Sequence, residues 1–269
     1  MTEADAIAAA TTPATPASIA RDLRALGLES GMTVMVHSSL SKLGFVVGGP
    51  QAVVAALLEV VGTTGTLMMP THSGALSDPA NWENPPVPER WWSPVRAEMP
   101  AFDPHLTPTR SMGAIVECFR GVPGVRRSNH PTVSAAAIGP NARALVEAHE
   151  LHDRFGESSP QGRLYELDGH VLLLGVDHAN NTSLHLSEAR SGLPELVADG
   201  APVLIDGQRA WVEIEHLEED SDDFAAIGEA FAATGKERHG TVGIGVGRLC
   251  RSRDVVDFGI EWMLANRTA

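Results

Sequence analysis

Residues 171–188, VLLLGVDHANNTSLHLSE, join an apolar run to a polar loop and a helical pattern. The apolar run has the length of a buried strand, and Asn181 or Thr182 can cap the helix that follows. His185 and Glu188 are three residues apart on that helix, so they share a face. A carboxylate beside an imidazole orients the ring and stabilises its cation, which leaves the other ring nitrogen to accept a proton. The stretch therefore indicates an enzyme built from strand-to-helix units.

Strand and helix patterns alternate along the rest of the chain. Short apolar strands are expected at 33–36, 66–69 and 132–138, and helices at 18–26, 51–61, 111–119 and 141–149, with Ser18 and Ser111 as caps. Beyond residue 195, two strand patterns flank Asp206-Gly207, a strong hairpin signal, before a helix at 224–233, a strand at 242–249 and a helix at 255–264. This order predicts an α/β fold, a three-layer αβα sandwich with an added antiparallel hairpin region.

Three segments differ in composition or pattern from the rest. Residues 1–17 are rich in Ala, Thr and Pro and are expected to form a loose leader before a single domain at 18–269. Residues 75–108 are rich in Pro and Trp, and a loop of that length inside a domain is typical of a lid-like insert. Residues 196–240 are expected to form a hairpin and helix appendage.

The charge balance narrows the classes of partner. The chain of 269 residues has 20 Lys and Arg against 34 Asp and Glu, a formal net charge of −14. An acidic chain lacks the basic surface that binds a phosphate backbone, so no nucleic-acid partner is expected. The excess negative charge suits a cationic small substrate, or simply solubility.

Cysteine, histidine and hydropathy patterns exclude further classes. Two cysteines cannot build a disulfide framework, and the 11 histidines lack the spacings of zinc enzymes, so no metal is expected. No apolar run approaches the roughly 20 residues of a membrane span, and the N-terminus lacks a signal-peptide core. We therefore expect a cytoplasmic protein, monomeric or homodimeric, with no membrane partner.

Other local motifs leave alternatives open. His37-Ser38-Ser39 follows a strand, where backbone N–H groups and hydroxyls can hold a phosphate, although the local sequence alone favours an ordinary strand-to-helix turn. The glycines at 243, 245 and 247 lack dinucleotide-binding spacing and are better explained by close packing of a strand. No Gly-x-Ser-x-Gly elbow occurs, which favours a histidine base that activates a bound nucleophile. An ordinary packed histidine remains the alternative for His185.

Five separate segments, in order, resemble the aminoglycoside 3-N-acetyltransferase family, the antibiotic N-acetyltransferases. Each segment is weak alone, but the five in register are specific. They are VHSSL at 36–40 with Gly44, GTLMMPT at 65–71, RSMG at 110–113 with RSNHP at 127–131, LLLGV at 172–176 with TSLHLSE at 182–188, and RSRD at 251–254.

The resemblance implies acetyl transfer from acetyl-CoA to the 3-amino group of a 2-deoxystreptamine aminoglycoside, without a metal. It implies a fold distinct from that of the commoner acetyltransferase superfamily. It makes His185 the general base and Glu188 its orienting partner. Asp177 would face the cationic antibiotic. Asp222 and Asp223 in the acidic run at 215–223 are expected to bind it as well, although such a run is most often a solvated turn. Those that would hold coenzyme A are His37, Ser38, Ser39, His72, Arg110, Ser111, Met112 and Gly113.

The chemistry expected from this resemblance is direct transfer in a ternary complex. An aminoglycoside amine is protonated at neutral pH, so a base must remove a proton before the nitrogen can attack the thioester. The main alternative keeps the acyl-CoA site and changes the acceptor to a different amine metabolite. A binding protein that sequesters a cation, and a zinc hydrolase, are the remaining alternatives.

Overall fold

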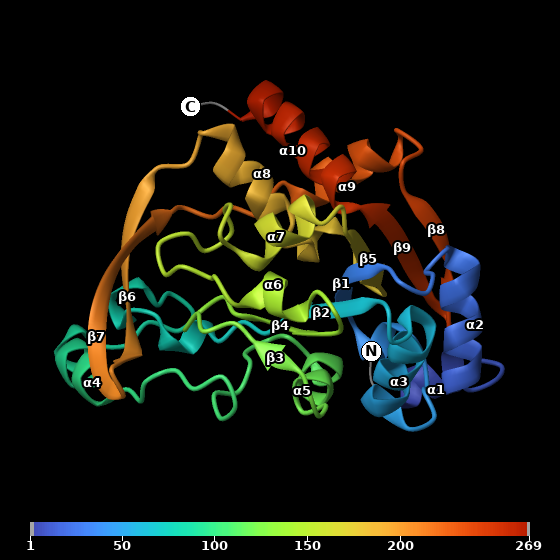
Figure 1. Cartoon of the computed structure of the whole chain (residues 1–269), viewed down its shortest axis with the longest axis horizontal. Helices are drawn as coiled ribbons and strands as arrows, with labels where there is room; N and C mark the ends of the chain where they lie inside the picture. The colour runs from blue at the N-terminus through green and yellow to red at the C-terminus, as the bar shows by residue number, and fades with distance from the viewer. Residues whose placement is uncertain (1–2, 268–269) are drawn as a thin grey trace.

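The computed structural model describes residues 3–267, in which seven strands form one mixed sheet in the order β3-β4-β2-β1-β5-β9-β8 (Figure 1). Strand β1 lies at its centre and is parallel to both neighbours, whereas the outer pairings are antiparallel. The strands are β1 Thr33–Ser38, β2 Thr66–Pro70, β3 Arg126–Arg127, β4 Ala135–Ile138, β5 His170–Leu174, β8 Arg238–Val242 and β9 Gly245–Arg251.

Helices cover both faces of this sheet because the central strands are apolar on both sides. Val34 and Val36 of β1 join the hydrophobic cluster beneath α2 Pro16–Leu26, α3 Gly49–Val61 and α5 Ala114–Arg120. Met35 points into the opposite cluster. The helices on that side are α6 Ala142–Val146, α7 Pro160–Glu166, α8 Leu184–Ser191, α9 Phe224–Ala232 and α10 Ser252–Asn266. The predicted three-layer α/β fold is confirmed.

A separate two-stranded hairpin extends from one side of the sandwich (Figure 1). Strands β6 Leu196–Ile205 and β7 Gln208–Leu217 pair along their whole length. Asp206 and Gly207 form the turn, both with positive φ (50° and 77°), which matches the twist of two antiparallel strands. The predicted hairpin is therefore confirmed at the predicted turn.

The insert at 75–108 packs against this hairpin. It contains helix α4 Trp92–Glu98 and the 3-10 turns η2 Gly74–Leu76, which begins just before the insert, η3 Pro79–Asn81 and η4 Glu89–Trp91. The Phe102 amide donates to Pro202 O at 3.1 Å, and Arg209 donates through Nε to Met99 O at 2.7 Å. A lid role for the insert stays a prediction.

The N-terminal segment differs from the expected loose leader. Helix α1 Glu3–Ala9 forms there, and Ala14 makes a bridge to Val46. The next helix begins at Pro16, because Thr15 and Ser18 form a reciprocal capping box in which Thr15, not Ser18, is the cap. The leader is therefore wrong for residues 3–17, while residues 1–2 lie outside the described part. The single domain at 18–269 stays a prediction. Residues 268–269 also lie outside the described part of the chain.

Several predicted boundaries also shift. Helix α5 begins at Ala114 rather than Ser111, because Ser111 and Gly113 have positive φ (60° and 86°) and stay outside the helix. The strand expected at 242–249 is two strands, with Gly243 in the turn between β8 and β9. Helix α8 begins after Ser183, and neither Asn181 nor Thr182 is its cap. Within residues 3–267, no helix is long and apolar enough to cross a bilayer.

Candidate active site

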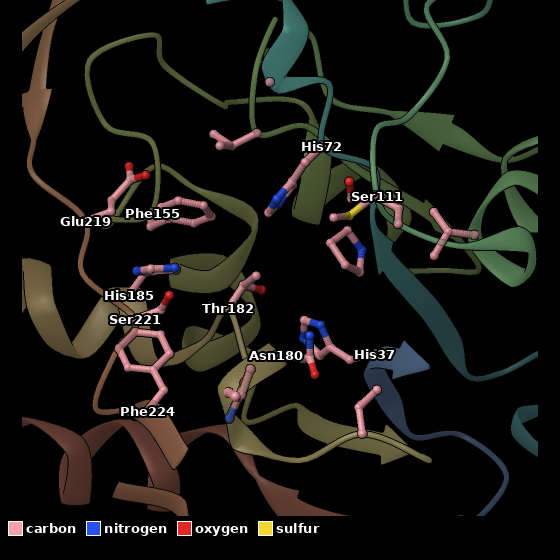
Figure 2. Close-up of a pocket in the computed structure, with 18 of the residues that line it drawn as sticks. His37, His72, Ser111, Phe155, Asn180, Thr182, His185, Glu219, Ser221 and Phe224 are labelled. Carbon is pink, nitrogen blue, oxygen red and sulfur yellow. The ribbon is translucent and has the colours of Figure 1, made fainter. Parts of the chain in front are cut away.

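A cavity of about 360 Å³ opens where the parallel strands β1, β2 and β5 end (Figure 2). Carboxyl ends of adjacent parallel strands meet at one edge of a sheet, so the loops after them share a crevice. The end of β1 contributes His37 and Ser38, and the loop after β2 contributes His72. The segment after β5 contributes Val176 and residues 179–182, including the last residues of η5 His178–Asn180.

His185 from α8 lies in the wall of this cavity, and its ring is held on three sides. Its Nδ1 is 2.5 Å from Glu188 Oε2, as the spacing of three residues predicts. The ring stacks on Phe155 with centroids 4.5 Å apart, and Phe224 lies against it at 4.8 Å. Since Nδ1 is engaged by a carboxylate, Nε2 is the nitrogen left to exchange a proton with a ligand.

Glu188 is buried, with 2% of its surface exposed, and both of its oxygens are engaged. Oε1 accepts from Arg267 Nη1 at 2.6 Å and from the Asp220 amide at 3.1 Å. Arg267 also donates to Asp223 through Nε at 2.7 Å and Nη2 at 2.6 Å. The hydrogen bonds to Asp223 and then to Glu188 raise the pKa of Arg267 above its usual value.

His37 and His72 line the cavity as neutral imidazoles. Burial, followed by the nearby His178 and His185, lowers the pKa of His37 to about 3. Burial and the neighbouring His185 lower the pKa of His72 to about 3 as well. Neither Nε2 has a hydrogen-bond partner among the described residues. Each ring therefore has a ring nitrogen available to a polar group of a ligand.

The structure brings together six of the predicted site residues in the cavity wall. These are His37, Ser38, His72, Ser111, Met112 and His185. Glu188 stands behind His185. Within the part of the chain that the structure describes, the other predicted residues do not line this cavity. They are Ser39, Arg110, Gly113, Asp177, Asp222 and Asp223. Their binding roles stay predictions.

The local contacts of the predicted carboxylates explain their positions. Asp177 accepts from the Ala179 amide at 3.0 Å and so caps η5. Asp223 is bound by Arg267, as described above, and Asp222 is exposed in the turn before α9. The acidic run instead places Glu219 and Ser221 in the cavity wall.

Sequence reasoning missed the residues that complete the wall beside His185. Arg154 and Phe155 come from the loop before α7, which has no periodic pattern and no motif. Asn180 and Thr182 belong to the quoted stretch, but only the fold shows that they face the cavity (Figure 2). A polar segment directly after a buried strand was the available signal for these two.

The loop that carries Asn180 is supported from behind by a buried pair. His178 Nε2 is 2.5 Å from Glu237 Oε1, and neither side chain is more than 3% exposed. Asn181 contacts His178 Nδ1 at 3.1 Å and accepts from the Ser183 amide at 3.1 Å. These contacts fix the path of the chain from η5 into α8, which places His185. Among residues 3–267, no three His, Cys, Asp or Glu side chains are grouped so as to hold a metal ion.

Comparisons with known proteins agree over nearly the whole chain. A family model described as aminoglycoside 3-N-acetyltransferase matches residues 35–264. The SPbeta prophage-derived aminoglycoside N(3')-acetyltransferase-like protein YokD of Bacillus subtilis (strain 168) is 46% identical over 95% of this chain and 94% of its own length. Aminoglycoside N(3)-acetyltransferase VII of Streptomyces paromomycinus is 39% identical over 93% of this chain and 92% of its own length.

Solved structures share the fold. The crystal structure of YokD from Bacillus subtilis superposes with a TM-score of 0.97 at 43% identity, covering 99% of this chain and 100% of that chain. AAC-IIIb, solved as a binary complex with CoASH, superposes with a TM-score of 0.84 at 31% identity, covering 94% of this chain and 97% of that chain. AAC-VIa, solved bound to sisomicin, superposes with a TM-score of 0.85 at 35% identity, covering 96% of this chain and 100% of that chain.

Proposed function

The chain belongs to the aminoglycoside 3-N-acetyltransferase family, and from this premise we propose that it transfers the acetyl group of acetyl-CoA to the 3-amino group of a 2-deoxystreptamine aminoglycoside. The observation that carries the proposal is the His185–Glu188 pair in the wall of the strand-end cavity. A base held by a carboxylate is what an amine acceptor needs, because the ammonium form has no lone pair.

His185 is the general base of the proposed reaction. Its Nε2 takes a proton from the acceptor ammonium, and the free amine nitrogen then attacks the thioester carbon. The nitrogen of the resulting tetrahedral intermediate loses its second proton to solvent as the C–S bond breaks, and the leaving thiolate takes up the proton that His185 carries. Glu188 stabilises the imidazolium while it exists, and no covalent acetyl-enzyme is formed.

The donor side of the cavity is proposed to lie around His37, Ser38, His72, Ser111 and Met112. The complex of the related AAC-IIIb with CoASH supports acetyl-CoA as the donor. The neutral rings of His37 and His72 suit the neighbourhood of a thioester oxygen, because an N–H there donates without bringing a charge. Ser39, Arg110 and Gly113 are proposed to contact parts of coenzyme A that extend beyond the cavity.

The acceptor side is proposed to lie around His185, Glu219 and Ser221. The complex of the related AAC-VIa with sisomicin supports an aminoglycoside acceptor. Asp177 and Asp222 are proposed to meet amino groups that reach past the cavity. Asp223 would act from its ion pair with Arg267.

A different amine acceptor is the second candidate, and one observation favours it. Glu219, a carboxylate in the cavity wall, is paired with Arg154 at 2.7 Å, so the wall attracts a polycation weakly. The relative YokD, at 46% identity, is itself described only as acetyltransferase-like.

Thiol release from acetyl-CoA with a panel of aminoglycosides and simple amines tests the function. Mass spectrometry should show one added acetyl group on the deoxystreptamine amine. His185→Ala should lower the rate by about 10²–10⁴-fold. Turnover only with simple amines would select the second candidate, and near-normal turnover of His185→Ala would refute the assigned base.

A further inference from the structure

We propose that Arg154 determines which acceptors the site accepts, by neutralising the Glu219 carboxylate beside His185. The pair then gives the additional ammonium groups of a polycationic acceptor no net attraction in this part of the wall. This inference rests on the proposed function, because it concerns the acceptor half of the same cavity. It follows from the geometry of one ion pair and from the charges of the residues around it.

The ion pair lies next to the base. Arg154 Nε is 2.7 Å from Glu219 Oε1, and the two side chains are only 15% and 20% exposed. Both residues, together with His185 and Glu188, also line a smaller hollow. Figure 2 shows Glu219 beside Phe155, the residue on which the His185 ring stacks. The pair and His185 therefore share the lining in which an acceptor amine would meet the base.

The two charges of the pair cancel within the lining of the cavity, and Asp199, which also lies 3.4 Å from Arg154, is not part of that lining. Among the described residues of the wall, Arg154 and Glu219 alone carry formal charge apart from histidines. His37 and His72, with pKa values of about 3, are neutral at physiological pH. A second or third ammonium group of an acceptor gains no net attraction from this lining, because Arg154 repels what Glu219 attracts.

Arg154 is held in this position by the hairpin. Its Nη1 is 3.4 Å from Asp199 Oδ2 of β6 and 3.0 Å from His216 Nε2 of β7. Asp199 is itself fixed, since its carboxylate accepts from the Asp78 amide at 2.8 Å. The guanidinium is therefore anchored on two strands. The hairpin thus acts on acceptor choice through Arg154.

A double-mutant cycle tests the proposal. Calorimetry at low salt measures Kd for sisomicin, which has several amino groups, and for glucosamine, which has one, on wild type, Arg154→Gln, Glu219→Gln and the double variant. Arg154→Gln should tighten sisomicin about tenfold, and Glu219→Gln should weaken it about tenfold. The double variant should return near wild type, glucosamine should change less than about threefold, and the differences should shrink with added salt.

Controls separate specificity from folding. Arg154→Lys keeps the charge and should bind sisomicin like wild type. Arg190→Gln removes a half-buried arginine that pairs with Glu157, outside both hollows, and should leave both Kd values unchanged. A merely structural role would weaken binding in both Arg154→Gln and Glu219→Gln, and so would overturn the proposal. A rise in the KM for acetyl-CoA in Arg154→Gln, without tighter sisomicin, would also overturn it. If no variant releases thiol with any amine, the proposed function fails, but the Kd pattern still decides the role of Arg154.

Discussion

Arg267 Nη1 lies 2.6 Å from Glu188 Oε1, while the opposite oxygen of Glu188 is 2.5 Å from His185. The carboxylate is thus fixed between His185, the proposed base, and an arginine that follows helix α10. Arg267 also binds Asp223 and donates to Asp220 O at 2.8 Å, so it ties the acidic loop to the same carboxylate. The orientation of the proposed base consequently depends on Arg267, which is 79 positions away from Glu188 in the sequence.

Arg267→Gln should therefore reduce both turnover and stability. Glu188 would keep His185 and the Asp220 amide but lose its cationic partner, which leaves a buried carboxylate less well compensated. We expect kcat to fall several-fold and the free energy of unfolding to fall by about 1–3 kcal/mol. Steady-state kinetics and urea unfolding measure the two. Arg163→Gln, which breaks an exposed pair with Glu166, is the matched control and should change neither; equal effects in both variants would contradict the assignment.

Glu188→Gln should lower kcat by about 10²-fold or more, with little change in the KM for acetyl-CoA. An amide keeps the size of the side chain but removes the charge that stabilises the His185 imidazolium. Its NH₂ group would also face either His185 or Arg267, both of which donate to the carboxylate. Glu157→Gln, on an exposed ion pair with Arg190, is the control. Retention of wild-type kcat would show that the carboxylate has no part in the reaction.

The sequence was sufficient wherever a contact is local. His185 and Glu188 are one helical turn apart, so their pairing follows from helix geometry, and Asp206-Gly207 selects its turn by local φ preference. The alternation of strand and helix patterns likewise predicted the layered fold. The loose leader failed because Thr15 caps α2 and Ala14 bridges Val46, contacts that composition does not reveal.

The rest of the site depends on contacts between distant segments. Arg154 reaches Asp199 and His216 across 45 and 62 positions, and no local pattern specifies such a meeting. Asp223 belongs to an acidic run that reads as a cation site, yet its partner is Arg267 of the same chain. An acidic stretch predicts a cation nearby, but only tertiary structure tells whether that cation is a ligand or an arginine.

The free energy of unfolding should fall as the pH drops below the ordinary pKa of histidine. The pKa of His37 is lowered from 6.5 to about 3 in the folded protein, so between these values the unfolded chain binds a proton that the folded chain does not. His37 therefore contributes stability above pH 6.5 that is lost as the pH falls toward 3. In His37→Gln, the slope of unfolding free energy against pH should be smaller by roughly 1 kcal/mol per unit between about pH 5.5 and 4.

Urea unfolding across that range measures the slope for wild type and His37→Gln. Phe119→Leu, a fully buried core substitution without a titratable group, lowers stability and should keep the wild-type slope. An unchanged slope in His37→Gln would mean that His37 takes up a proton in the folded protein as readily as in the unfolded chain.

Gly228→Ala should disturb the cavity from the far side of η5. A Cβ at Gly228 of α9 would lie 2.4 Å from His178 Cβ and 2.6 Å from His178 Cγ, which is closer than two carbon atoms that are not bonded to each other can approach. His178 is held by Glu237, so the clash would move η5 and with it Asn180. We expect a loss of about 1–3 kcal/mol in unfolding free energy and a higher KM for substrate. Gly121→Ala, where the added methyl meets Cys118 O at an ordinary 3.6 Å, should stay within about 0.5 kcal/mol of wild type. Equal stability of the two variants in urea unfolding would show that α9 and η5 move apart freely and do not fix the wall of the cavity.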